Sequence, residues 1–365
     1  MNRRNVLFIT SFHPGGRGVI GAGEAICETN VKTLVEQGDN VYLVCIGQKY
    51  QQINSKVAAL CLEYHTLEHT RFQSLLALLQ QMRYGAIWAP WLFTRVTRRN
   101  VKIIKEFIDQ YNIDYVWLEF PSSLGFSTHL ASMSIDYFVH DVVSQNISRR
   151  LILRLLLPFV RGVESRLLSI VSRCIVLSDK DKSLVQSMGF IGAIKVIPPE
   201  GIKVGQVDEA IAVSQIISDF EGGMNLVFFG SMRRSENHWS ILYFLLFVYP
   251  KIFNTHKDVR FWVIGLSPNW LLKILGKIIP GLHVVGAVDD PVPAFRAATL
   301  CIVPLLMGAG VKIKVLQMLE AGANVVATPV GAEGISADRK LTVVGTELFA
   351  DTVCRKLSDV KLSKS

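Results

Sequence analysis

Two lysines beside a glycine-rich turn are the residues of this sequence best placed for binding chemistry. An apolar run at 301–306 has the length of a strand, the turn 308–310 interrupts it, and apolar residues then recur at helical spacing until Gly322. Lys312 and Lys314 fall in the first helical turns, where the helix dipole disfavours a cation. Backbone N–H groups at a helix start bind anions, and a bound phosphate would neutralise both lysines. The pattern therefore indicates a phosphate site.

A second candidate is the pair His140 and Asp141, which closes the predicted strand 137–140. A histidine at the carboxyl end of a strand can orient a substrate or stabilise charge that develops during a reaction. Judged by residue type alone, a structural role for such a histidine is the simpler interpretation.

The segment 12–23 holds Gly16, Gly18 and Gly21 in the spacing G-x-G-x-x-G. This spacing occurs in dinucleotide-binding folds, but alone it is a weak signal. Residues 13–15 separate it from the strand before it, and the next strand, 40–47, ends without the acidic residue that holds a ribose. We therefore reject NAD binding and interpret the segment as a flexible loop.

Length and composition describe a folded protein of about two domains. The chain has 365 residues, half of them hydrophobic, and no run reaches the ~18 apolar residues of a spanning helix. The apolar run after the first basic residues is too short for a signal peptide and indicates a buried strand. Six scattered cysteines without histidine partners at metal spacing indicate reduced thiols in a cytoplasmic protein without a metal site.

The net charge of +9 is concentrated in two clusters, 95–105 and 149–173. The second holds six arginines against one acidic residue, Glu164, with apolar residues between them. A basic helix with an apolar face suits an anionic membrane surface, whereas a helix that packs on the core with solvated arginines shows the same pattern. Both interpretations stay open, and this local distribution does not lead us to expect nucleic acid as a partner.

Strands alternate with helices along both halves of the chain, which is the pattern of parallel, doubly wound sheets. Residues 201–223 have mixed polarity, end in two glycines and are predicted to be a linker. We expect an α/β fold of two doubly wound Rossmann-like domains facing a cleft. The boundaries would be 1–200 for the N-terminal domain, 224–345 for the C-terminal domain and 346–365 for a final helix or tail. Ligands of such sheets bind at the carboxyl ends of the strands.

Residues 308–335, GAGVKIKVLQMLEAGANVVATPVGAEGI, closely resemble the nucleotide-sugar signature of family 4-like glycosyltransferases of the GT-B fold. A second segment, 228–245, resembles the first strand, turn and helix of the same domain. The resemblance implies that the glycines approach a diphosphate and that Lys312 or Lys314 pairs with it. The donor-binding residues that it implies are Gly230, Ser231, Arg233, Asn237, Gly308, Ala309, Gly310, Lys312, Lys314, Gln317 and Glu333.

Gln317 departs from the family pattern, which usually has a glutamate here to hold the ribose hydroxyls. An amide can donate and accept hydrogen bonds to a diol, but it lacks the strength that a charge adds. For the whole 308–335 segment, an ordinary βαβ turn without a ligand is the alternative.

The resemblance also places the pair His140 and Asp141 beside the reacting sugar, which makes them the predicted catalytic residues. Similar retaining enzymes are thought to work without a protein nucleophile, because an oxygen of the donor phosphate takes the acceptor proton. The glycine loop with Gly16, Gly18 and Gly21 would close over the donor phosphate and the acceptor, as in similar glycosyltransferases.

The function implied is a retaining, hexosyltransferase-type enzyme that moves a sugar from a nucleotide-diphosphate donor to a glycan or lipid-linked acceptor. Such proteins usually build cell-surface polysaccharide at the cytoplasmic face of the membrane. No cofactor and no metal are expected, because no D-x-D pair lies beside the signature. Two alternatives remain, a nucleotide-sugar 2-epimerase of the same fold and a non-catalytic relative that binds nucleotide or glycan.

Overall fold

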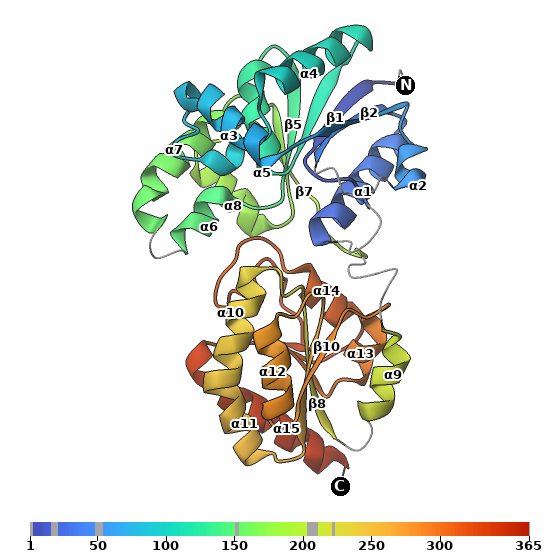
Figure 1. Cartoon of the computed structure of the whole chain (residues 1–365), viewed down its shortest axis with the longest axis vertical. Coiled ribbons are helices and arrows are strands. Elements are labelled where there is room, and N and C mark those ends of the chain that lie inside the picture. The colour runs from blue at the N-terminus through green and yellow to red at the C-terminus, as the bar shows by residue number, and fades with distance from the viewer. Residues whose placement is uncertain are drawn as a thin grey trace. The chain divides into compact units, whose positions relative to one another are not determined.

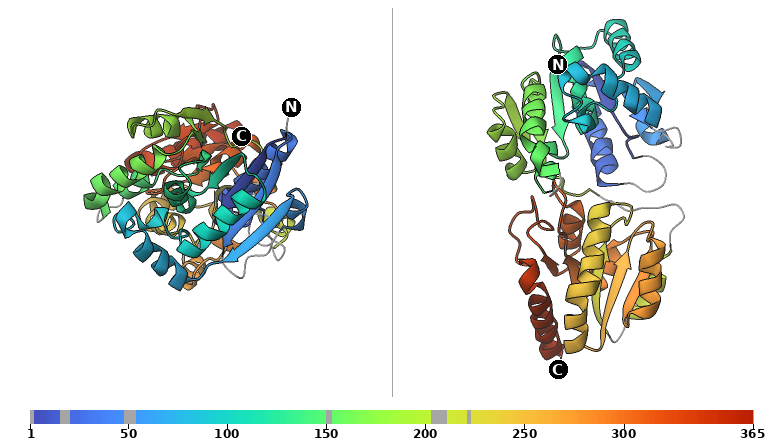
Figure 2. Two further views of the ribbon diagram at one scale, coloured as in Figure 1. Left: turned by 90° about the horizontal axis from the view of Figure 1, so that it is seen from above. Right: turned by 60° about the vertical axis from the view of Figure 1, so that its left-hand side comes forward.

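The computed structural model describes residues 3–15, 21–47, 54–149, 153–202, 211–220 and 223–364. The chain divides into two compact units, the first ending at Pro199 and the second continuing from Glu200. Figure 1 shows one sheet in each unit with helices packed along its faces, and Figure 2 shows the same elements from two other directions.

The N-terminal unit is built on seven parallel strands in the order β3-β2-β1-β4-β5-β6-β7. The strands are β1 (Asn5–Thr10), β2 (Asn40–Gly47), β3 (Glu63–Glu68), β4 (Tyr115–Glu119), β5 (Ser134–Val139), β6 (Arg173–Val176) and β7 (Ala193–Val196). Every residue of β4 is buried, as expected for a central strand covered by helices on both faces.

Helices join these strands in alternation. They are α1 (Ala22–Glu36), α2 (Ser55–Ala58), α3 (Arg71–Gln80), α4 (Arg98–Gln110), α5 (Pro121–Leu124), α6 (Val143–Ser148), α7 (Leu157–Leu168) and α8 (Asp179–Ser187), with 3-10 turns η1 (Met82–Tyr84), η2 (Pro90–Leu92), η3 (Gly125–His129) and η4 (Leu153–Leu156). The predicted basic helix is therefore shorter than 149–173: its regular part is α7, which follows the short turn η4.

The C-terminal unit has six parallel strands in the order β10-β9-β8-β11-β12-β13. They are β8 (Met224–Phe229), β9 (Val259–Ile264), β10 (Leu282–Gly286), β11 (Leu300–Val303), β12 (Val325–Ala327) and β13 (Leu341–Val343). The helices are α9 (Val213–Ile217), α10 (Ser235–Tyr243), α11 (Tyr249–Thr255), α12 (Trp270–Ile278), α13 (Val292–Ala297), α14 (Ile313–Glu320) and α15 (Phe349–Lys364), with short turns η5 (Ser218–Phe220), η6 (Phe244–Val248, a π-turn) and η7 (Thr346–Leu348).

Both sheets reverse their strand order once, and that point locates the expected ligand sites. In the N-terminal unit β1 lies between β2 and β4, and in the C-terminal unit β8 lies between β9 and β11. The order is that of a Rossmann-like, doubly wound sheet, which confirms the predicted class of two such domains. Ligands of these sheets bind beyond the carboxyl ends of the strands at the reversal.

Candidate functional site

In the C-terminal unit, the glycine turn joins β11 to α14 at the reversal of the sheet, next to the end of β8. Gly308 and Gly310 have φ values of 120° and 71°, which disfavour a side chain, so these positions require glycine. The helix begins at Ile313, slightly later than the spacing predicted, and its N-cap, Lys312, makes no side-chain capping bond. The first N–H groups of α14 therefore have no side-chain acceptor from their N-cap residue.

Lys314 is half-buried, and its amine points into the interior of this region. Its Nζ donates a hydrogen bond to Asn237 Oδ1 at 2.9 Å and lies 4.3 Å from the centre of the Phe228 ring. The Asn237 amide in turn donates to the Ser231 carbonyl at 2.8 Å. Burial, and then the positive charges of Lys312 and Arg234, lower the pKa of Lys314 to about 7. The structure thus brings three of the predicted donor residues together around one buried amine.

Gly230 explains how the end of β8 can lie so close to that amine. A Cβ atom at this position would lie 2.8 Å from Asn237 Nδ2 and 3.2 Å from Lys314 Nζ. A side chain here would push against the hydrogen-bonded pair, so the packing favours glycine at this position. Packing is therefore a second reason for glycine at position 230, in addition to the close approach of a ligand.

Lys312 has a different environment from Lys314. Its Nζ donates to the carbonyls of Ala309 and Gly310 at 2.7 and 2.6 Å and lies 3.7 Å from Glu333 Oε2. The Lys312 and Glu333 side chains are both nearly buried. Lys312 therefore ties the glycine turn together and pairs with the acidic residue of the second glycine turn.

Two further predicted donor residues differ sharply in exposure. Gln317, on α14, is buried, and its Oε1 atom has no hydrogen-bond partner. A buried acceptor without a donor costs about 1–3 kcal/mol, so a ligand hydroxyl at this point would recover that free energy. Arg233 instead lies on the surface, where its Nε donates to Ser267 Oγ at 3.0 Å.

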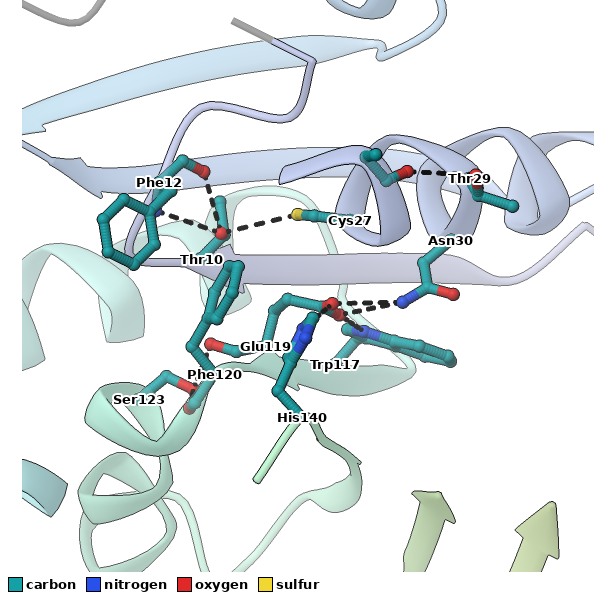
Figure 3. Close-up of polar contacts among 11 residues, drawn as sticks. Thr10, Phe12, Cys27, Thr29, Asn30, Trp117, Glu119, Phe120, Ser123 and His140 are labelled. Carbon is teal, nitrogen blue, oxygen red and sulfur yellow. Dashed lines mark hydrogen bonds and ion pairs between the residues drawn. The ribbon is translucent and has the colours of Figure 1, made fainter. Parts of the chain in front are cut away.

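In the N-terminal unit, His140 directly follows the last residue of β5 and pairs with a buried carboxylate (Figure 3). Its Nε2 lies 2.6 Å from Glu119 Oε1, and the Glu119 side chain is fully buried. The same carboxylate accepts the indole N–H of Trp117 at 2.6 Å and the amide of Asn30 at 3.1 and 3.3 Å. With three donors from β4, α1 and the end of β5, the carboxylate fixes the orientation of the His140 ring.

Phe120 covers the other side of the histidine. Its ring stacks on His140 with centroids 4.1 Å apart and an angle of 8° between planes. The Phe120 backbone has φ 71° and ψ 151°, a conformation that residues with side chains rarely adopt and that often marks a functional site. Gly23 of α1 lies close to both rings. A Cβ atom at this position would lie 2.8 Å from the Phe120 ring and 3.9 Å from His140 Nδ1.

Glu119 and Asn30 were not predicted, although the sequence contains one signal for Glu119. Glu119 is the single charged residue of a strand in which every other side chain is apolar or aromatic, and it stands at the carboxyl end. Asp141 follows His140 and is half-buried. Of the predicted glycine loop, Gly21 is half-buried just before α1, whereas Gly16 and Gly18 lie outside the described residues.

Arg95 is a second residue whose setting the sequence did not reveal. It belongs to the predicted basic cluster 95–105, yet its Nε atom is buried without a hydrogen-bond partner, and no carboxylate of the described residues forms an ion pair with it. Burial and the charge of Arg95 lower the pKa of His69 to about 4, with a smaller opposing effect from the Thr94 backbone. Arg95 is half-buried, and a guanidinium whose Nε atom has no acceptor suits an anionic group.

Within the described ranges there is no group of three His, Cys, Asp or Glu side chains that could hold a metal ion. The same part of the chain contains no helix that is both long and apolar enough to cross a bilayer.

Comparison with known protein families gives a match over part of the chain. Residues 223–359 match the model of the family described as glycosyl transferases group 1. A curated relative, the uncharacterized 44.6 kDa protein in the cps region of Klebsiella pneumoniae, is 26% identical over 136 residues. That match covers 34% of this chain and 35% of the relative, about a third of the relative's length.

Solved structures resemble the whole chain. Sucrose-phosphate synthase from Thermosynechococcus elongatus has a TM-score of 0.66 at 13% identity, covering 99% of this chain and 90% of its own. HepE of Anabaena, solved with UDP and glucose, gives 0.62 at 13% identity over 98% and 91% of the two chains. WaaG, a glycosyltransferase involved in lipopolysaccharide biosynthesis, gives 0.60 at 15% identity over 98% and 91%. At these identities the structures show a shared fold.

Proposed function

We propose that this chain is a retaining glycosyltransferase of the GT-B fold. The match of residues 223–359 to the model of glycosyl transferases group 1 supports this proposal, as does the fold shared with solved glycosyltransferases. The enzyme moves a sugar from a nucleotide-diphosphate donor to a glycan or lipid-linked acceptor in the synthesis of cell-surface polysaccharide. The acceptor class is supported by the similarity to WaaG, which acts in lipopolysaccharide biosynthesis, and the donor class by HepE, which binds UDP.

The observation that carries the donor assignment is the buried amine of Lys314 at the reversal of the C-terminal sheet. An ammonium group out of water is unfavourable unless an anion pairs with it, and burial has lowered the pKa of this one to about 7. A pyrophosphate at the mouth of the glycine turn supplies that charge and also accepts the N–H groups at the start of α14. The ribose hydroxyls then meet the unpartnered oxygen of Gln317.

The transfer itself needs no protein nucleophile. As the bond from the sugar to the diphosphate breaks, the acceptor hydroxyl attacks the same face of the sugar, and its proton passes to an oxygen of the leaving phosphate. His140 binds a hydroxyl of the reacting sugar. Because the imidazole is held by the Glu119 carboxylate through Nε2, the other nitrogen, Nδ1, is the one that faces substrate.

A thermal-shift screen of nucleoside diphosphates and their sugar conjugates tests the proposal. A true donor stabilises the folded protein by mass action, about 2.7 kcal/mol at a concentration one hundred times its Kd. Lys314→Met should abolish the shift, because it removes the charge that meets the pyrophosphate. If no nucleotide stabilises the wild-type protein, the donor assignment is wrong.

Two other functions need separate measurements. A 2-epimerase would produce free epimerised nucleotide sugar when no acceptor is present, and the glycosyltransferase would not. A non-catalytic relative, which the replacement of a family glutamate by Gln317 suggests, would bind the donor tightly without transferring or hydrolysing the sugar. Product analysis with and without acceptor distinguishes all three functions.

We place the reaction on the cytoplasmic side of the cell membrane, where a lipid-linked acceptor is accessible.

A further inference from the structure

Helix α3 of the N-terminal unit has an apolar face that is exposed to solvent. Phe72, Leu75 and Leu79 are 73%, 56% and 60% exposed, and Leu76 is also exposed. These positions follow the i, i+3, i+4, i+7 spacing of one helix face, which a soluble protein normally packs against its core. Ala77 is the one residue of α3 that is buried. The helix is capped at its start by Thr70 and Gln73, so it is a well-formed element despite this exposure.

The exposed apolar residues continue beyond α3. Met82, Ile87, Trp88 and Trp91 are all exposed in the segment that follows, which contains η1 and η2. The Trp88 ring stacks on Phe159 at the start of α7, with centroids 4.4 Å apart. We call the exposed apolar residues of α3, of segment 82–91 and of segment 155–159 the apolar surface.

The contact with α7 holds this apolar surface together. The Arg166 guanidinium donates to the Tyr84 carbonyl at 2.5 Å, and Gly85 packs directly against Val163. Leu155, in η4 just before α7, is 84% exposed. In Figure 1, α3 and α7 lie on the same side of the N-terminal sheet. The three segments therefore form one face of the unit.

The charged residues of the two sequence stretches that supply the apolar surface are almost all basic. Residues 69–105 contain seven Lys or Arg and no Asp or Glu, and 149–173 contain six Arg and only Glu164. Glu164 is itself buried, where it accepts the N–H groups of Val143 and Ser144. Arg71, Arg83 and Arg154 are exposed. No exposed acidic side chain of these two stretches offsets their charge.

From these observations we infer that the apolar surface docks on an anionic lipid bilayer. Leucine and phenylalanine side chains would enter the outer part of the acyl region, the tryptophans would lie at the interface, and the arginines would pair with headgroup phosphates. A second copy of this chain is a poorer occupant, because a symmetric contact would bring the same arginines together. The docking would serve transfer to a lipid-linked acceptor, and for that purpose it rests on the proposed function.

The position of the apolar surface differs from the membrane contact predicted from sequence. The apolar face of α7 is formed by Val160, Val163 and Leu167, and all three are buried in the core of the unit. The regular part of the basic segment is therefore a core-packing helix with solvated arginines. The exposed apolar residues come from α3 and the segment after it, with Leu155 and Phe159 at the edge.

Sedimentation with lipid vesicles tests the inference. The full chain is mixed with vesicles of phosphatidylcholine alone or with added phosphatidylglycerol, and the bound fraction is measured. Wild type should bind the anionic vesicles, less so at high salt, and Phe72→Ser with Leu79→Ser should weaken binding about tenfold or more. The matched control is Leu246→Ser with Phe247→Ser, an equally exposed apolar pair in the C-terminal unit.

Three results would overturn the inference: no binding by wild type, equal binding to neutral vesicles, or the same loss in the control pair. A dimer in solution that disappears in the α3 variant would also overturn it, in favour of a second copy. Nucleotide-induced thermal stabilisation, measured on the same variants, should be unchanged. This measurement reports folding and donor binding, whereas sedimentation reports lipid binding. A wrong donor assignment and a wrong docking inference therefore give different results.

Discussion

At the scale of single residues, the buried amine of Lys314 makes donor binding depend on pH. Its pKa is about 7 in the free protein, and a pyrophosphate raises it. Binding therefore takes up a proton above pH 7, and affinity should be highest below that pH. It should fall as the pH rises from about 7 to the pKa of the complex, by at most tenfold per unit. Isothermal titration with nucleoside diphosphate across this range measures the slope.

Lys314→Arg provides the control for that dependence. Arginine keeps its charge throughout the range, so the slope should disappear even if the longer side chain weakens binding. A wild-type slope of zero, or an unchanged slope in the variant, would remove Lys314 from the donor site.

Glu119→Gln tests whether the carboxylate acts through His140. The glutamine keeps the size of the side chain but removes the charge that orients the imidazole and stabilises it when positive. We expect kcat to fall by about tenfold to a hundredfold with little change in donor KM, because His140 acts on the reacting sugar. The thermal midpoint is measured in parallel. If kcat stays constant while stability falls, the residue is structural only.

Gln317→Glu addresses the departure from the family pattern. If the side chain reaches the ribose, a carboxylate should accept the hydroxyl hydrogen bonds more strongly and tighten nucleotide binding by about 1 kcal/mol. The comparison uses Kd values for wild type and variant with the same nucleoside diphosphate. An unchanged Kd would place Gln317 outside the ribose contact.

Residue identity and spacing did not distinguish the two lysines of the predicted donor site. Both lie in the same glycine signature, two positions apart. Only the packing shows that Lys312 binds turn carbonyls while Lys314 binds the side chain of Asn237. Glu119 was missed for a related reason. Its partners come from Asn30 and His140, which are 89 and 21 positions away, and such contacts leave no local pattern.

At the scale of elements, the close approach of β8 and β9 at their carboxyl ends gives a stability prediction. A Cβ on Gly265 would lie 2.0 Å from the Gly230 carbonyl oxygen, and φ at Gly265 is 145°. Gly265→Ala should lower the free energy of unfolding by more than about 2 kcal/mol, because backbone must move. Chemical denaturation measures this loss.

Gly38→Ala is the matched control for that variant. Gly38 also has positive φ, 89°, but nothing lies within 4 Å of a Cβ built there. The Gly38→Ala variant should lose only the free energy of unfolding that backbone strain removes, about 1 kcal/mol. Equal losses in the two variants would show that the contact with Gly230 is unimportant.

Helix ends are hard to predict from sequence where two effects compete. Pro250 has no N–H to donate and would be expected to end a helix, yet the π-turn at 244–248 changes the hydrogen-bond pattern before it and the helical segment continues to Thr255. The short strands β3 and β13 were not predicted, because alternating polar residues and a length of three residues carry little signal.

At the scale of the whole molecule, two separate cores predict that the donor function belongs to one unit. The buried apolar residues of the C-terminal unit form one cluster, from Val213 to Leu357, and those of the N-terminal unit form another, from Leu7 to Phe190. Each unit therefore buries enough apolar surface around its own sheet to fold without the other. A fragment from Glu200 to the end of the chain should fold and unfold cooperatively.

That fragment should also keep donor affinity and lose transfer. Every donor-binding residue proposed above lies in it, from Gly230 to Glu333, whereas His140 and Glu119 do not. We expect the fragment to bind nucleoside diphosphate within about threefold of the full chain, since each threefold change corresponds to only about 0.65 kcal/mol. Circular dichroism during thermal unfolding and titration calorimetry measure the two properties. A folded fragment that fails to bind would mean that the N-terminal unit contributes contacts to the nucleotide, and the donor site would then have to be assigned to both units.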